Sequence, residues 1–155
     1  MRLCGEVMKV DVVAPGNRLP FPNKSVDFVI SSHVLEHFFN PLSALQEWSR
    51  VARQFVFVII PHRAALPSDA DKPITPIYEL LARYTGEIAD PGTDDHHTRW
   101  TMDSFHQMCE LVGMKVLESH ERDDKVGNGH LFVLTPNWLV SHTFTNAAGS
   151  SILSA

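Results

Sequence analysis

The chain lacks the features that mark several large classes of protein. Only two of its 155 residues are cysteines, Cys4 and Cys109, and no CxxC motif occurs, which excludes a disulfide-rich secreted scaffold. No run of 18 apolar residues and no signal-peptide pattern is present, so we expect a cytoplasmic protein with no membrane partner. Positive charge is not in excess, with 13 Lys and Arg against 18 Asp and Glu, so nucleic acid is not expected as a partner.

Two short segments have the composition of buried strands in a parallel sheet. Residues 26–31 and 55–60 are rich in β-branched and aromatic residues, and residues 10–14 form a weaker candidate of the same kind. Between the first two, Asn40 and Pro41 are suited to begin a helix. The apolar stripe of this helix consists of Leu42, Leu45, Trp48 and Ala52. Strand, helix and strand in this order predict a βαβ unit with parallel strands.

The second half of the chain predicts two more helices and a hairpin. The helices begin near Thr75 and Thr101, and the second of them ends at Gly113. Residues 115–121 and 131–135 read as two strands, and the polar stretch between them is typical of a turn.

These elements together predict one α/β domain over residues 1–140. We expect a Rossmann-like, mostly parallel sheet that ends in a C-terminal antiparallel hairpin. Residues 141–155 accumulate Ser, Thr, Asn, Ala and Gly without periodicity, which predicts a flexible C-terminal tail.

Ligands of open α/β sheets bind beyond the carboxyl ends of the strands, where loops and helix N-termini meet. This rule selects three short segments of the chain as candidates for the site. They are residues 15–17, 31–33 and 61–63.

One stretch of sequence carries a specific pattern. Leu19-Pro-Phe21, Ser25-Val-Asp27, Val34-Leu-Glu-His37 and Asn40-Pro41 follow one another in an order and spacing that resembles class I S-adenosylmethionine-dependent methyltransferases. With lower specificity, the resemblance covers the interval from Val10 to Val133. It implies methyl transfer with S-adenosylmethionine as the cofactor.

The resemblance also implies which residues line the cofactor. Backbone groups of Ser31, Ser32 and His33 would lie against its methionine part. The family usually has an acidic residue that meets the adenine, but here Ala14 is followed by Pro15-Gly16. Only a backbone contact near Gly16 or Asn17 is therefore expected on the adenine side.

The sequence departs from the family at its N-terminal end. The family has a Gly-rich turn after its first strand, whereas none of the eight glycines forms a G-x-G motif ahead of Val26. We therefore expect an N-terminally incomplete methyltransferase fold. The alternative to an enzyme is a catalytically inactive remnant that acts as an interaction or oligomerisation module. In either case the strand at residues 26–31 would expose an edge, so a homodimer through this edge is expected.

Histidines supply the candidates on the side of the methyl acceptor, which we expect to be a small molecule or a glycan. His62 directly follows a predicted strand, and His96 and His97 end the cluster Asp94-Asp-His-His97. Imidazole exchanges protons near neutral pH, so each could serve as a base or contact the substrate. The alternative is a structural role in loops. Glu36 likewise suits the first turn of a helix, where a carboxylate stabilises the dipole.

Nine histidines also raise the question of a metal site. No common metal-binding spacing of His and Cys occurs, and no metal is expected. The remaining alternative is a site in which His33 and His37 are joined by His62 or His97.

Overall fold

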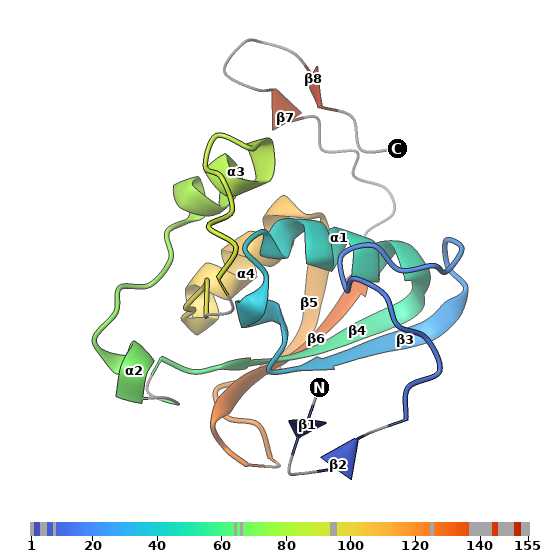
Figure 1. The fold of residues 1–155 in the computed structure, drawn as a ribbon, viewed down its shortest axis with the longest axis horizontal. Helices are drawn as coiled ribbons and strands as arrows, with labels where there is room; N and C mark the ends of the chain where they lie inside the picture. Colours follow the sequence, from blue (N-terminus) through green and yellow to red (C-terminus); the bar gives the residue numbers. More distant parts are fainter. Residues whose placement is uncertain are drawn as a thin grey trace.

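The centre of the fold is a four-stranded sheet with the strand order β3-β4-β6-β5 (Figure 1). Its strands are β3 (Val26–Ser32), β4 (Ala52–Pro61), β5 (Met114–His120) and β6 (Gly129–Pro136). The computed structural model describes residues 2–3, 6–7, 9–63, 65, 67–93, 96–124, 126–136, 144–145 and 151–152. The α/β class, the strands near residues 26–31 and 55–60, and the C-terminal hairpin are all confirmed.

The direction of the strands differs from the prediction. β3 and β4 run parallel, whereas β6 is antiparallel to both β4 and β5, so the described sheet is mostly antiparallel rather than mostly parallel. The weaker strand prediction at residues 10–14 is wrong. Val10, Val12 and Val13 are exposed and belong to no strand, because no described strand lies beside them to pair with.

The predicted helices are present and begin where the sequence places them. They are α1 (Pro41–Val51), α3 (Ile77–Thr85) and α4 (Met102–Leu111). The side chain of Asn40 accepts a hydrogen bond from the Ser43 amide at 3.2 Å, and Thr101 forms a capping box with Ser104. The helix start expected around Glu36 is the 3₁₀ helix η1 (Leu35–His37), and one short helix, α2 (Pro67–Ala70), was not predicted.

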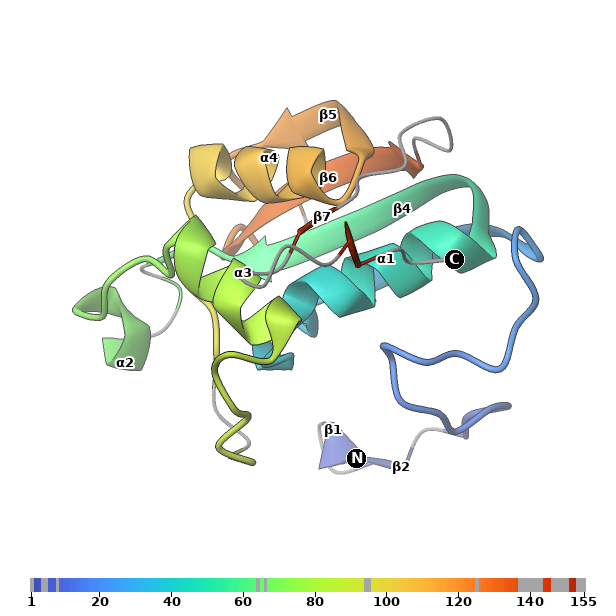
Figure 2. The same cartoon turned by 90° about the horizontal axis from the view of Figure 1, so that it is seen from above.

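The three longer helices lie on one face of the sheet (Figures 1 and 2). Alternate residues of β4 point to this face, and Val56, Val58 and Ile60 are fully buried there. They pack in one hydrophobic core with the apolar stripes of the helices. Its largest members include Leu45, Trp48, Trp100, Phe105, Met108 and Phe132.

The opposite face of the sheet is only partly covered. Phe28 and Ile30 on β3 are 51% and 68% exposed, and Phe55 and Phe57 on β4 are half-buried. The prediction that residues 26–31 form a fully buried strand is therefore wrong, although Ser31 is buried. β3 is an edge strand of the described sheet, and the predicted exposure of this edge is confirmed.

Four further strands form two small antiparallel pairs. β1 (Arg2–Leu3) pairs with β2 (Glu6–Val7), and β7 (Phe144–Thr145) pairs with β8 (Ser151–Ile152). Apart from β7 and β8, the predicted flexible tail over 141–155 lies outside the described residues, and the boundary at residue 140 stays a prediction. Cys109 is a buried free thiol. None of the helices in the described ranges is long and apolar enough to cross a membrane.

Candidate functional site

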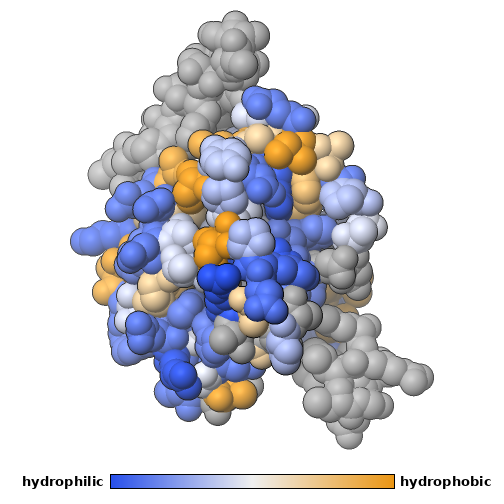
Figure 3. Space-filling view, turned by 90° about the vertical axis from the view of Figure 1, so that its left-hand side faces the viewer, coloured by the Kyte–Doolittle hydropathy of each residue, from blue (hydrophilic) through white to orange (hydrophobic). Residues whose placement is uncertain are grey.

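β3 and β4 run parallel, so their carboxyl ends lie together at one end of the sheet, on the left in Figure 1. This end of the sheet, and not the side formed by β3, is the edge at which the candidate residues lie. η1 follows β3 at this edge, and the loop between α3 and α4 returns to it. Figure 3 shows the molecule from this side, where hydrophilic side chains predominate around a few apolar ones. The edge therefore combines polar groups from segments that are far apart in the sequence.

Glu36 of η1 is the central buried polar residue of this edge. Its side chain is 1% exposed, and no hydrogen-bond partner of its Oε2 occurs among the described residues. Burial raises its pKa to about 7. Its backbone carbonyl accepts hydrogen bonds from the amides of His97 and Thr98, at 2.8 and 3.3 Å. These two bonds attach the α3–α4 loop to η1.

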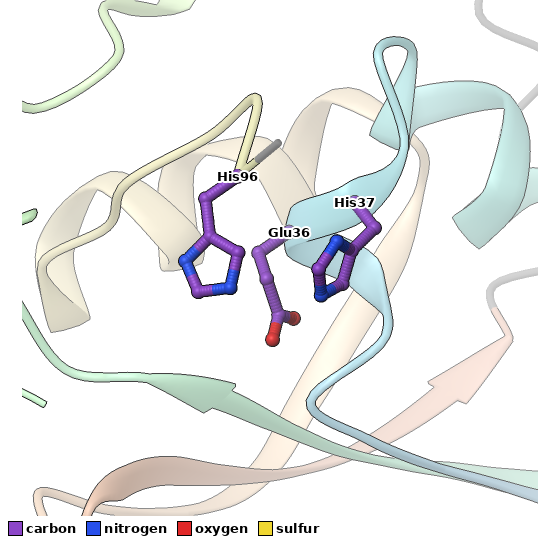
Figure 4. A group of neighbouring side chains, drawn as sticks. All are labelled: Glu36, His37 and His96. Atoms are coloured by element: carbon purple, nitrogen blue, oxygen red, sulfur yellow. The ribbon is translucent and has the colours of Figure 1, made fainter. Parts of the chain in front are cut away.

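His96 lies beside Glu36, and its imidazole is held from the other side by Asp69. Nδ1 of His96 is 2.6 Å from a carboxylate oxygen of Asp69. The His37 ring meets the His96 ring edge-on, with 4.7 Å between the centroids. Figure 4 shows Glu36, His37 and His96 grouped together, and each offers one potential ligand atom within 4.8 Å of the other two.

Asp69 of α2 is fixed by cations as well as by His96. Arg99 Nε and Lys72 Nζ lie 3.1 and 3.3 Å from its Oδ1. Burial alone would raise the pKa of Asp69, but the hydrogen bonds from His96, Lys72 and Arg99 outweigh it and lower the pKa. Asp69 is therefore an ionised carboxylate that orients the His96 ring.

The structure separates the side chains of the two adjacent histidines. The His97 ring packs edge-on against Phe39, and its Nε2 is 3.0 Å from the carbonyl of Thr93. The neighbouring Arg83 bonds to the carbonyls of Phe39 and His97. Only His96 joins the group around Glu36, whereas His97 is tied to it through its backbone. Asp94 and Asp95 lie outside the described residues.

His62 follows β4 and faces the start of β6. Its amide donates to the carbonyl of Asn128 at 3.2 Å, and its ring centroid is 6.1 Å from that of His130. Burial lowers the pKa of His62, with smaller contributions from the charges of His130 and Arg122. His62 also forms an isolated β-bridge with Trp100, which links the end of β4 to the segment that follows His96.

The three residues expected on the methionine side end β3. Ser31 is buried, and its hydroxyl has no hydrogen-bond partner among the described residues, while Ser32 is exposed. His33 adopts a positive φ of 51° and its amide donates to the carbonyl of Ile59 at 2.9 Å. A buried unpaired hydroxyl beside an exposed turn of backbone fits the polar contacts that the implied cofactor needs.

Gly16 and Asn17 lie in a loop that is fixed to α1. The indole of Trp48 donates to the Gly16 carbonyl at 2.8 Å, and a Cβ at Gly16 would lie 2.7 Å from the Phe38 ring. Only glycine fits this contact without a shift. The Gly16 carbonyl is therefore already bonded within the chain, while Asn17 is exposed.

Sequence reasoning missed the most tightly bonded part of this edge. It placed Glu36 in the first turn of a helix, and it did not consider Asp69 or Arg99. Glu36 lies inside the Val34-Leu-Glu-His37 motif, and this position could have identified it as a candidate site residue. Asp69 and His96 are 27 residues apart and no local spacing connects them.

The fold and one sequence segment match known proteins. Residues 3–60 match the family model described as a methyltransferase domain. No curated protein sequence matches the chain significantly. Among solved structures, one similar chain belongs to the complex between the Haloferax volcanii Trm112 methyltransferase activator and a proposed methyltransferase. The identity is 15% and the TM-score is 0.58. The match covers 87% of this chain and 66% of the other.

Two further solved structures are similar at the level of the fold. An O-methyltransferase from neocarzinostatin biosynthesis, solved with S-adenosylmethionine and 2-hydroxy-5-methyl naphthoic acid, has 15% identity and a TM-score of 0.53 over 81% of this chain and 32% of its own. A Methanosarcina mazei S-adenosylmethionine-dependent methyltransferase has 14% identity and a TM-score of 0.50 over 79% of this chain and 65% of its own. The matches span 32% to 66% of the length of these proteins.

The described residues thus have an α/β fold of the methyltransferase type. Residues 3–60 carry the sequence pattern of a methyltransferase domain, which confirms the resemblance to class I S-adenosylmethionine-dependent methyltransferases.

Proposed function

We propose that the chain acts in S-adenosylmethionine-dependent methyl transfer to a small molecule or a glycan. The observation that carries the proposal is the hydroxyl of Ser31, which is buried at the carboxyl end of β3 and has no hydrogen-bond partner among the described residues. Open α/β sheets bind their ligands at this position, and a buried polar group without a partner is unfavourable unless a ligand or solvent pairs with it.

We propose that two segments of the chain contact the cofactor. Ser31, Ser32 and His33 would contact the methionine part, and backbone groups of Gly16 or Asn17 would contact the adenine. When bound, S-adenosylmethionine supplies an electrophilic methyl group on a sulfonium. The chain's own task is then to align the donor and the acceptor, and to remove a proton where the acceptor carries one.

His96 is the best candidate base on the acceptor side. Asp69 bonds to its Nδ1 and favours a proton there, which leaves Nε2 as the basic nitrogen. Nε2 is also the ring nitrogen turned toward Glu36 (Figure 4). His62 remains a second candidate for contact with the acceptor. For His97 we propose a positioning role, because its ring is engaged by Phe39 and Thr93.

Isothermal titration with S-adenosylhomocysteine tests this proposal. We expect saturable binding of one molecule, and Ser31→Ala should weaken it by about fivefold to tenfold, the usual effect of one hydrogen bond. Ser119→Ala on β5 is the control, because its hydroxyl contacts His106 instead of the proposed site, and it should leave the affinity unchanged. An absence of heat at millimolar ligand would contradict the proposal for this chain.

A second candidate function is an interaction module that assembles through β3. The apolar side chains of Phe28 and Ile30 on an edge strand favour it, since such surfaces pair with other chains. We propose a second copy of this chain as the occupant. This function does not require the cofactor, so binding of S-adenosylhomocysteine separates the two candidates.

The expected cytoplasmic location also stays a prediction.

A further inference from the structure

Glu36, His37 and His96 form a group in which each residue offers a metal ligand atom, and these atoms all lie within 4.8 Å of one another (Figure 4). Glu36 and His37 come from η1, and His96 comes from the α3–α4 loop, which the carbonyl of Glu36 fixes in place. The group is therefore held by two segments that are bonded to each other. We propose that these three residues bind one divalent transition-metal ion, with Zn²⁺ as the best fit.

The carboxylate of Glu36 supports this proposal most directly. Its Oε1 lies 3.7 Å from Nδ1 of His33, while its Oε2 has no partner within the described part of the chain although the side chain is 1% exposed. A buried carboxylate oxygen without a partner is unfavourable in a protein interior. A cation bound at Oε2 would supply the missing interaction.

The surroundings of His96 also match those of a metal ligand. Histidines that bind metals commonly donate their second ring N–H to a carboxylate, which fixes the tautomer and increases the basicity of the ligating nitrogen. Here Asp69 is 2.6 Å from Nδ1, and Arg99 and Lys72 hold Asp69 in turn. The lone pair of Nε2 is thereby directed to the side of Glu36.

The set of donors selects the class of metal. Two imidazoles and one carboxylate suit Zn²⁺ and its first-row neighbours, whereas Mg²⁺ and Ca²⁺ prefer oxygen ligands. Three protein ligands leave at least one coordination position open, as in catalytic zinc sites. If the proposed methyl transfer holds, this position would bind the oxygen of an acceptor, and the ion would then take the place of the His96 base, because Nε2 of His96 would be its ligand.

Metal binding by the untagged, EDTA-treated and desalted full chain tests the proposal. We expect one Zn²⁺ per chain in a competition titration against a chromogenic chelator, and one Co²⁺ with a visible spectrum typical of nitrogen and oxygen ligation. Glu36→Gln and His37→Gln should each lower the Zn²⁺ affinity at least 100-fold. Asp69→Asn should lower it by about 10 to 100-fold, since Asp69 acts only through His96.

His120→Gln is the matched control. His120 also pairs with a carboxylate, Glu118, but both are more than half exposed, so the substitution should leave the affinity unchanged. Circular dichroism of each variant identifies any that fails to fold, and the Co²⁺ spectrum of the unchanged chain does not depend on the variants.

Two results would overturn the proposal. One is sub-stoichiometric Zn²⁺ and Co²⁺ binding by the unchanged chain. The other is equal binding by a folded Glu36→Gln or His37→Gln variant. Titration with S-adenosylhomocysteine in EDTA reports on the cofactor site separately, so failure of the metal site leaves the proposed function to its own test.

Discussion

Glu36 is almost completely buried, and its Oε2 has no hydrogen-bond partner in the described part of the chain, so ionising it in the metal-free protein is unfavourable. Burial raises its pKa from 4.5 to about 7. Because the folded pKa is the higher one, the native state binds more protons than the unfolded state between these values. The associated stabilisation is complete below pH 4.5 and is lost as the pH rises to about 7.

We therefore predict that Glu36→Gln removes a pH dependence of stability. Between pH 5 and pH 8 the free energy of unfolding of the unchanged chain should fall by roughly 2 to 3 kcal/mol relative to that of the variant. Urea denaturation of both proteins in EDTA measures this difference. Comparing the two proteins cancels the opposite trend from His62, whose lowered pKa favours the native state at higher pH. A constant difference across this range would contradict the account of Glu36.

At the residue scale, the sequence identified candidate site residues but did not predict which of them lie together in the structure. His96 was found from its cluster of charged neighbours, and it does contact a carboxylate, that of Asp69, which lies 27 residues away in the sequence. His97 was predicted to act with His96, yet its ring packs on Phe39. Adjacent residues of an extended loop point to different sides, and only the tertiary structure decides which side meets the site.

At the scale of elements, α1 holds the loop that contains Gly16 and Asn17. Glu47 accepts a hydrogen bond from the amide of Leu19 at 2.6 Å, and Arg50 donates to the carbonyls of Phe21 and Leu19 at 2.8 and 3.2 Å. Arg50 also bonds to Glu47, so the two side chains act as one clamp. This clamp joins the Leu19-Pro-Phe21 motif to α1, the helix that Asn40 caps.

We predict that Arg50→Lys loosens this loop without unfolding α1. Lysine keeps the charge but cannot reproduce the planar fork of the guanidinium, so the bonds to Leu19 and Phe21 are lost. Hydrogen exchange at the Leu19 amide should accelerate by about tenfold, while amides in the middle of α1 keep their protection. Arg53→Lys is the control, since its ion pair with Asp27 is half exposed and should be worth little. Equal exchange in both variants would refute the clamp.

Local signals predicted most elements correctly. The caps at Asn40 and Thr101 fixed the starts of α1 and α4, because these side chains bond to amides only three residues away. The segment at residues 10–14 has the composition of a strand. A strand also needs a second strand beside it to form hydrogen bonds, and composition does not show whether one is there. The short α2 was missed because its four residues carry no periodic pattern.

At the scale of the whole molecule, the sheet has one covered and one partly exposed face. The helices bury Val56, Val58 and Ile60, while Phe28 and Ile30 on the other face remain more than half exposed. The sequence predicted that β3 would lie at an edge of the sheet, as it does among the described strands. It could not predict that β6 would lie between β4 and β5, since strand order depends on contacts distant in the sequence.

We predict that the chain self-associates through β3. Sedimentation velocity at micromolar concentration should show a dimer, and Ile30→Lys should abolish it by placing a charge on the apolar face. Because Ile30 is 68% exposed, the substitution should change the stability of the monomer by less than about 0.5 kcal/mol. Tyr78→Lys on α3, which is 75% exposed, is the control and should leave the dimer intact. A monomer at all concentrations would count against this interface.

The central claim is that the cofactor binds at the carboxyl end of β3. An NMR titration of the ¹⁵N-labelled chain with S-adenosylmethionine tests it most directly, because each backbone amide reports its own surroundings. We expect saturable shifts of the amide signals of Ser31, Ser32 and His33, together with those of Gly16 and Asn17. A spectrum that does not change, or shifts confined to the turn between β5 and β6, would contradict it.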